Sequence, residues 1–268
     1  MYKGETIEAP SSKKTRRNWR GFFQAFGRAH KKASAEFETS MPLLKHLDEL
    51  RQRLFKAFLA VLATTAISFV FSKQIIDYLA HPVGGSEGLV SIDVTENISI
   101  FMKVSLLSGF VLGMPFIVYQ ALRFIMPGLK SNERLWLLLG VPFASLLFAG
   151  GVAFTWFIML PVAVPFLTNF LGITTQVRPA NYFDFITRLM FWIGVCFEMP
   201  LIVMFLAKLK FVTAKQLISG WRYAIVGAAI VAAVVTPTVD PVNMGLVTAP
   251  LLALYLISII LAAIVGRD

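Results

Sequence analysis

The stretch Phe191–Val203, FWIGVCFEMPLIV, is apolar except for one carboxylate, Glu198. Around it, hydrophobic residues make up 57% of the 268 residues, and the mean hydropathy is +0.71. This is well above the balance of a soluble globular domain. The formal net charge is +10, so the charged residues must be concentrated in a few segments. These features predict an all-α integral membrane protein with basic aqueous ends.

Six apolar runs stand out along the chain, and Gly and Pro recur inside them, as is common in membrane helices. The fifth run has only about 13 residues, so a helix would rise about 20 Å against a hydrocarbon core of about 30 Å. Taken alone, that run could be a re-entrant segment. The six runs are Phe55–Phe71, Ser99–Leu122, Leu135–Leu160, Phe185–Ala207, Tyr223–Val235 and Met244–Val265.

Lysine and arginine separate between alternate loops. Thirteen lie in the tail 1–56, three in 122–134 and four in 207–222, whereas 72–97, 161–183 and 236–243 hold one, one and none. Because cytoplasmic loops carry the excess of positive charge, this alternation predicts six transmembrane helices with both termini in the cytoplasm. The short fifth helix then requires a locally thinned bilayer or shelter from its neighbours.

We expect residues 1–40 to form a basic cytoplasmic tail and residues 41–268 to form the membrane domain. Within the tail, Trp19, Phe22, Phe23 and Phe26 have helical spacing and are flanked by Lys and Arg. Either an amphipathic helix on an anionic membrane surface or a solvated basic tail fits this pattern. After the first span, 73–80 reads as a short interfacial helix that ends at the His81-Pro82 pair.

The chain offers no pattern for a catalytic or metal site. Its three histidines are far apart, it has one cysteine, and no HExxH, GxSxG, CxxC or P-loop sequence occurs. We therefore predict no enzymatic activity, no metal and no cofactor.

Glu198 is the most informative polar residue within the spans. A carboxylate near the bilayer centre costs about 3 kcal/mol on insertion scales, so its presence indicates a function. The in-span cations Lys103 and Arg188 lie near the external ends of their runs. We expect Glu198 to contact Gln, Ser, Thr or water rather than either cation.

Two further acids fall on the basic, cytoplasmic side. The segment HLDELRQRL, 46–54, contains Glu49, and its pattern alone favours a surface helix with paired charges. In GMPFIVYQALRFIMPGLKSNERLW, 113–136, Glu133 suits the first turn of the third helix. Two acids on a surface otherwise rich in Lys and Arg could receive paired arginines.

Five motifs in order carry a resemblance to a known family. They are HLDELRQRL, the lysine at 103, the PFIVYQALRFIMPGL segment with its following ER pair, FEMP, and TPTVD at 236–240. Together they resemble TatC, the multi-span receptor of the twin-arginine protein translocase, from about His46 to the C-terminus. The resemblance implies the same six-span topology, built as a concave, glove-like bundle.

The resemblance also implies roles for individual residues. The signal-peptide-binding acids would be Glu49 and Glu133, with Arg51, Pro127 and Leu129 in the same cytoplasmic site. Glu198 would be an intramembrane contact for a partner, with Gln120 a further polar position. Pro82 and Asp240 match external-side functional positions. Other positions of the family motifs are His46, Lys103, Pro115, Tyr119, Phe124 and Pro200.

The implied function is that of a core receptor and translocon subunit. It would bind twin-arginine signal peptides and, in an oligomeric complex with single-span TatA- and TatB-type partners, export folded proteins using the proton motive force. We expect no nucleic-acid partner, and a location in the cytoplasmic (inner) membrane of a prokaryote rather than a thylakoid membrane. Two departures from the family pattern are the tail of about 40 residues and Leu256, where many members have Glu.

The alternative from another class is a proton- or ion-coupled secondary carrier in which Glu198 titrates. It would need a polar path from Glu198 to both sides of the membrane, and the fourth span offers few further polar residues. An intramembrane enzyme is a more distant alternative, because the chain lacks a nucleophile–base or metal-binding set.

Overall fold

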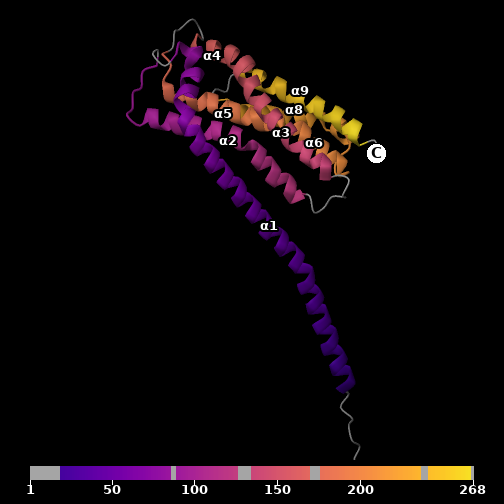
Figure 1. Ribbon diagram of the computed structural model, residues 1–268. Coiled ribbons are helices and arrows are strands. Elements are labelled where there is room, and N and C mark those ends of the chain that lie inside the picture. Colours follow the sequence, from indigo (N-terminus) through magenta and orange to yellow (C-terminus); the bar gives the residue numbers. More distant parts are fainter. Residues whose placement is uncertain (1–18, 86–88, 126–133, 170–175, 237–240, 267–268) are drawn as a thin grey trace, which may run out of the picture. The chain divides into compact units, whose positions relative to one another are not determined.

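The structure is a computed structural model that describes residues 19–85, 89–125, 134–169, 176–236 and 241–266. Its regular elements in this part of the chain are all helical (Figure 1). The α-helices are α1 Trp19–Ala80, α2 Glu96–Ile125, α3 Arg134–Phe154, α4 Leu160–Thr168, α5 Pro179–Phe197, α6 Met199–Lys208, α7 Ala214–Ser219, α8 Trp221–Val235 and α9 Pro241–Val265.

The chain divides into two compact units, Met1–Arg51 and Gln52–Asp268. In the first unit the structure describes the beginning of α1, including the family segment from His46. In the second unit the remainder of α1 is followed by α2 to α9.

Within the described residues, five helical segments are long and apolar enough to cross a membrane, which confirms the predicted all-α membrane class. A shorter apolar helix, α8, has 15 residues and rises about 22 Å. The five candidate spans are His46–Val83, Glu96–Phe124, Gly140–Thr168, Pro179–Lys208 and Pro241–Val265.

Three helices differ from the sequence prediction in their continuity. Residues 73–80 belong to α1 rather than to a separate helix, although α1 does end at Ala80 and a 3₁₀ turn, His81–Val83, follows. The third span includes a π-helical turn, Thr155–Met159, before α4. Pro161 in the first turn of α4 provides no N–H, which favours such a local irregularity. The fourth span is divided at Glu198 into α5 and α6.

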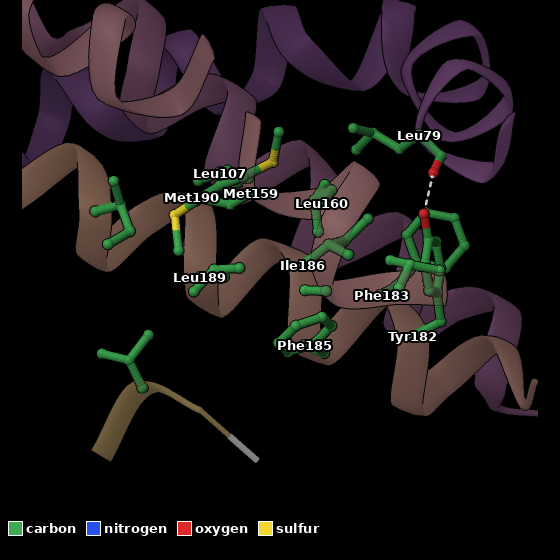
Figure 2. Packing of buried hydrophobic residues seen from close by; sticks show 14 of the residues in the cluster. Leu79, Leu107, Met159, Leu160, Tyr182, Phe183, Phe185, Ile186, Leu189 and Met190 are labelled. Atoms are coloured by element: carbon green, nitrogen blue, oxygen red, sulfur yellow. Dashed lines mark hydrogen bonds between the residues drawn. The ribbon is translucent and has the colours of Figure 1, made fainter. Parts of the chain in front are cut away.

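Helix α5 is at the centre of the larger hydrophobic core. Its residues Phe183, Ile186, Leu189 and Ile193 are at most 2% exposed. They join buried residues of α1, α2, α4, α8 and α9 in one cluster, part of which is seen in Figure 2. In that view the Tyr182 hydroxyl donates a 2.7 Å hydrogen bond to the carbonyl oxygen of Leu79. This bond ties the beginning of α5 to the end of α1.

Small residues allow α1 and α2 to approach closely. The Thr64 hydroxyl donates to the Gly109 carbonyl oxygen at 2.7 Å, and the Ser72 and Ser105 hydroxyls are hydrogen-bonded to each other. A Cβ added at Gly109 would lie 2.5 Å from the Thr65 Cα, so only glycine fits there. Small side chains and interhelical hydrogen bonds are the usual means of helix association in a membrane.

Candidate functional site

Glu198 occupies the break between α5 and α6. Its backbone is α-helical, with φ −73° and ψ −17°, and its carbonyl oxygen accepts from the Ile202 N–H at 3.0 Å. Pro200, which is buried, falls in the first turn of α6, where its missing N–H is best tolerated. The break is therefore explained by the FEMP sequence itself.

The Glu198 side chain is 7% exposed. In the described part of the chain, its Oε1 atom is buried without a hydrogen-bond partner. Lys208, the end of the candidate span, is ten residues further on, or about 15 Å of helical rise. An unpaired buried carboxyl oxygen costs about 1–3 kcal/mol, and more if it is charged. The described residues therefore do not compensate the burial of this oxygen.

The contact of Glu198 with Gln, Ser, Thr or water stays a prediction, since none of the described side chains is hydrogen-bonded to its Oε1 atom. Lys103 and Arg188, which we did not expect to reach it, both bind Asp184 instead. The Lys103 Nζ donates to Asp184 Oδ1 at 2.9 Å, and Arg188 Nη2 donates to Asp184 Oδ2 at 3.1 Å. Gln120 lies on α2 and is half-buried.

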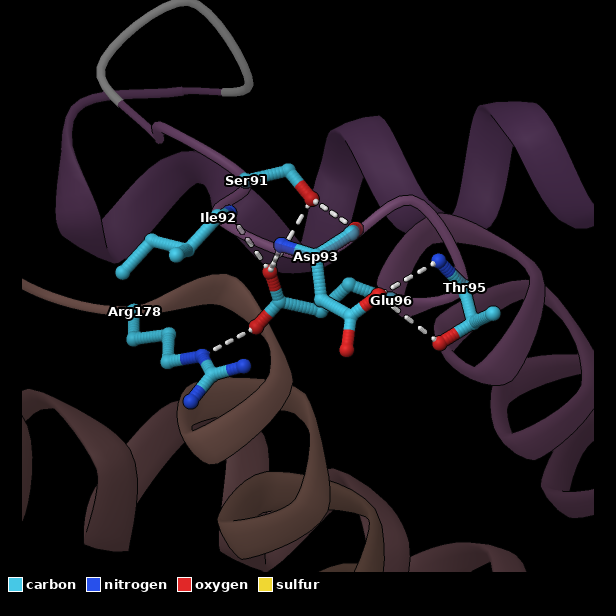
Figure 3. Close-up of polar contacts among 6 residues, drawn as sticks. All are labelled: Ser91, Ile92, Asp93, Thr95, Glu96 and Arg178. Atoms are coloured by element: carbon cyan, nitrogen blue, oxygen red, sulfur yellow. Dashed lines mark hydrogen bonds and ion pairs between the residues drawn. The ribbon is translucent and has the colours of Figure 1, made fainter.

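A third ion pair joins the beginnings of α2 and α5 (Figure 3). Arg178 Nε lies 2.5 Å from Glu96 Oε1. The other carboxylate oxygen, Oε2, accepts from the Ser91 hydroxyl at 2.9 Å and from the N–H groups of Ile92 and Asp93 at 2.9 and 3.3 Å. Glu96 is 4% exposed, and these bonds satisfy both of its oxygens. The pair therefore fixes the segment before α2 against α5.

Sequence reasoning missed Glu96, Arg178 and Asp184 as interacting residues. Asp184 and Arg188 are spaced i, i+4 on one helix, which is a visible signal for an ion pair. No comparable signal exists for Glu96 and Arg178, because 82 residues separate them.

Four further family-motif positions lie within α2 or the 3₁₀ turn that follows α1. The Tyr119 hydroxyl accepts from Arg123 Nη1 at 3.2 Å, and the guanidinium lies 5.8 Å from the ring centroid. Pro115 lies inside α2. Phe124 is half-buried near the end of α2, and Pro82 is exposed in the 3₁₀ turn.

The predicted signal-peptide site is only partly described. In the first unit, His46 Nδ1 lies 3.9 Å from Glu49 Oε2, one turn apart on α1. Glu49 is half-buried and Arg51 is exposed. Pro127, Leu129 and Glu133 lie outside the described residues, as does the external position Asp240. The meeting of Glu49 and Glu133 in one site therefore stays a prediction.

Comparison with known proteins supports the resemblance seen in the motifs. Residues 45–250 match the family model of TatC, the Sec-independent protein translocase protein. The TatC protein of Deinococcus radiodurans is 37% identical over 237 residues, covering 84% of this chain and 87% of the relative. The chloroplastic TATC of Arabidopsis thaliana is 38% identical over 234 residues, covering 86% of this chain and 68% of that relative.

A solved crystal structure, described as the twin-arginine translocase receptor TatC, has the same fold. It superposes with a TM-score of 0.74 at 35% identity, covering 83% of this chain and 100% of that one. The chain thus belongs to the TatC family of Sec-independent protein translocase proteins, which are non-enzymatic transport components of twin-arginine translocation.

Proposed function

We propose that this chain is the core receptor subunit of a twin-arginine translocase in the cytoplasmic membrane of a prokaryote. It binds twin-arginine signal peptides at its cytoplasmic face. With TatA- and TatB-type single-span partners, it exports folded proteins using the proton motive force. The observation that carries this proposal is the match of residues 45–250 to TatC, since that range includes Glu49 and Glu133.

The proposed topology has six crossings and both termini in the cytoplasm. Five long helical segments supply five of the crossings, and α8 supplies the short sixth. The alternation of Lys and Arg between loops supports this assignment. Helix α8 packs against α9, so a neighbour shelters part of its surface where the bilayer exceeds its length. Residues 41–268 then form the membrane domain, and 1–40 form a basic cytoplasmic tail.

The chemistry of the proposed receptor site is charge-assisted hydrogen bonding. An arginine guanidinium presents N–H donors in a planar fork that matches a carboxylate in bidentate geometry. Glu49 and Glu133 supply two carboxylates for the two guanidiniums of the signal. Lysine keeps the charge but lacks the fork, so a twin-lysine signal binds more weakly. Arg51, Pro127 and Leu129 complete the site around the acids.

Glu198 has a different role in this proposal. Its buried Oε1 atom lacks a partner among the described residues, so it can accept a hydrogen bond from a partner span or from an inserted signal. It acts after the signal has been recognised at the surface. Leu256, where this chain departs from the Glu of the family pattern, is apolar and 61% exposed on α9, so it supplies no polar contact to a partner span.

A vesicle assay separates the receptor from a proton- or ion-coupled carrier. We expect purified protein in sealed vesicles to capture a fluorescent twin-arginine signal peptide, and to produce no pH change when an ion gradient is imposed. Empty vesicles and a peptide without the arginines are the controls. Ion or proton flux through the protein alone, without peptide capture, would identify the carrier and reject the receptor.

A further inference from the structure

A cavity of about 380 Å³ lies between α4, α5 and α8, near the first residues of α5. Its polar lining includes Arg178, Arg188, Asp184, Asn181 and Gln176. Both arginines are largely accessible, with exposed side-chain fractions of 43% and 48%. Two guanidiniums therefore face one cavity at an end of the helix bundle.

The ion pairs beside the cavity leave hydrogen-bond donors in excess. Three cations, Lys103, Arg178 and Arg188, face two carboxylates, Glu96 and Asp184. All four carboxylate oxygens already accept hydrogen bonds. In the part of the chain that the structure describes, Arg178 donates only through Nε and Arg188 only through one Nη. A guanidinium has five N–H donors, so the remaining N–H groups of both arginines are available to an anionic ligand.

The lining of the cavity also includes apolar residues, Val164 and Leu167 of α4, Phe185 of α5 and Val235 of α8. Inorganic phosphate has no apolar surface, so these apolar residues contribute nothing to its binding. A ligand that carries both an anionic group and a hydrocarbon chain matches both parts of the lining.

The position of the cavity points to the membrane as the source of that ligand. Pro179 begins a candidate span, so in the proposed topology the cavity lies toward a membrane surface. Arg188 is nine residues into the span, about 14 Å of helical rise. Its long side chain can place the guanidinium toward the headgroups while its methylene groups remain in apolar surroundings.

We propose that this cavity binds one anionic phospholipid. Its phosphate accepts hydrogen bonds from Arg178 and Arg188, and an acyl chain lies against Phe185 and Val235. The lipid phosphate accepts from guanidinium N–H groups that donate to none of the described residues. This inference depends on the cavity and its charges, and it does not depend on twin-arginine recognition.

The test is native mass spectrometry of the delipidated full-length protein, titrated with phosphatidylglycerol, phosphatidylcholine or inorganic phosphate. We expect one phosphatidylglycerol to bind before any other lipid. Arg188→Gln should weaken that binding roughly tenfold, the loss of one charge-assisted hydrogen bond. Asp184→Asn should strengthen it severalfold, because a competing acceptor charge is removed. Arg222→Gln, at the opposite end of α8, should leave it unchanged.

The opposite signs of two neighbouring substitutions separate a binding site from general damage to the fold. Equal retention of phosphatidylglycerol by the parent protein and Arg188→Gln would overturn the proposal. So would a change in the same direction for Arg188→Gln and Asp184→Asn. Binding of inorganic phosphate as tight as that of the lipid would identify a free phosphate site instead. Thermal melting of each variant in the same detergent confirms that it is folded.

Discussion

Changing Glu133 or Glu49 to glutamine should reduce photo-crosslinking of a twin-arginine signal peptide by about ten- to a hundredfold, with the protein still inserted in the membrane. A hydrogen bond to a charged group contributes about 1.5–3 kcal/mol, and 1.4 kcal/mol corresponds to a factor of ten. Glutamine preserves the side-chain size but removes the charge. The measurement is the crosslinking yield at equal protein in membrane vesicles.

Asp48→Asn is the matched control for Glu49→Gln, because Asp48 is the preceding residue on α1 and is exposed. It removes the same charge and should leave the crosslinking yield near that of the parent. If the crosslinking yield fell as much in the Asp48 variant as in the Glu49 variant, general surface charge rather than a defined site would explain peptide binding. Full crosslinking in both glutamate variants would contradict the assignment of these two acids to the signal-peptide site.

Changing Glu198 to methionine should raise the thermal stability of the purified protein and yet lower transport about tenfold or more. The buried Oε1 atom has no partner in the described part of the chain, so its removal relieves a cost of about 1–3 kcal/mol. Methionine keeps much of the volume and avoids a cavity. Transport falls because the partner span or signal loses its polar contact. The measurements are the melting temperature in detergent and cargo import into inverted vesicles.

The control for Glu198 is Ile202→Met, one helical turn further along the fourth span. Ile202 is 55% exposed on the surface of the described protein, so this change should alter neither stability nor transport appreciably. Signal crosslinking should stay normal in the Glu198 variant, since the proposed function assigns recognition to Glu49 and Glu133. Normal transport by Glu198→Met would mean that the carboxylate is merely tolerated.

Hydropathy and charge were sufficient to predict the membrane class and the apolar segments. A run of 13 apolar residues corresponds to α8, whose 15 residues form a helix too short for an ordinary bilayer. Such predictions succeed because each transmembrane helix satisfies its own backbone hydrogen bonds, so that its pattern is local. Glu198 could also be singled out from the sequence as a candidate functional residue, since a single carboxylate in an apolar run is unusual.

The sequence did not reveal which charged side chains pair with one another. The ion pair of Glu96 with Arg178 depends on how the α2 and α5 ends are placed by the packed core. Likewise, Lys103 and Asp184 are 81 residues apart, and only the packing of α2 against α5 brings them together. Pro200 was a partial signal for the helix break at Glu198, because proline lacks the N–H group that a continuous helix uses. The π-helical turn at Thr155–Met159 had no such signal, because proline and glycine are common throughout these helices.

The most direct test of the receptor assignment is co-purification of the full-length protein with a twin-arginine signal peptide and with its twin-lysine version. Both peptides carry the same charge, so only the geometry of the guanidinium fork differs. We expect the twin-arginine peptide to be retained at least about tenfold better, equivalent to about 1.4 kcal/mol. Equal retention of the two peptides would contradict recognition of paired arginines by this protein.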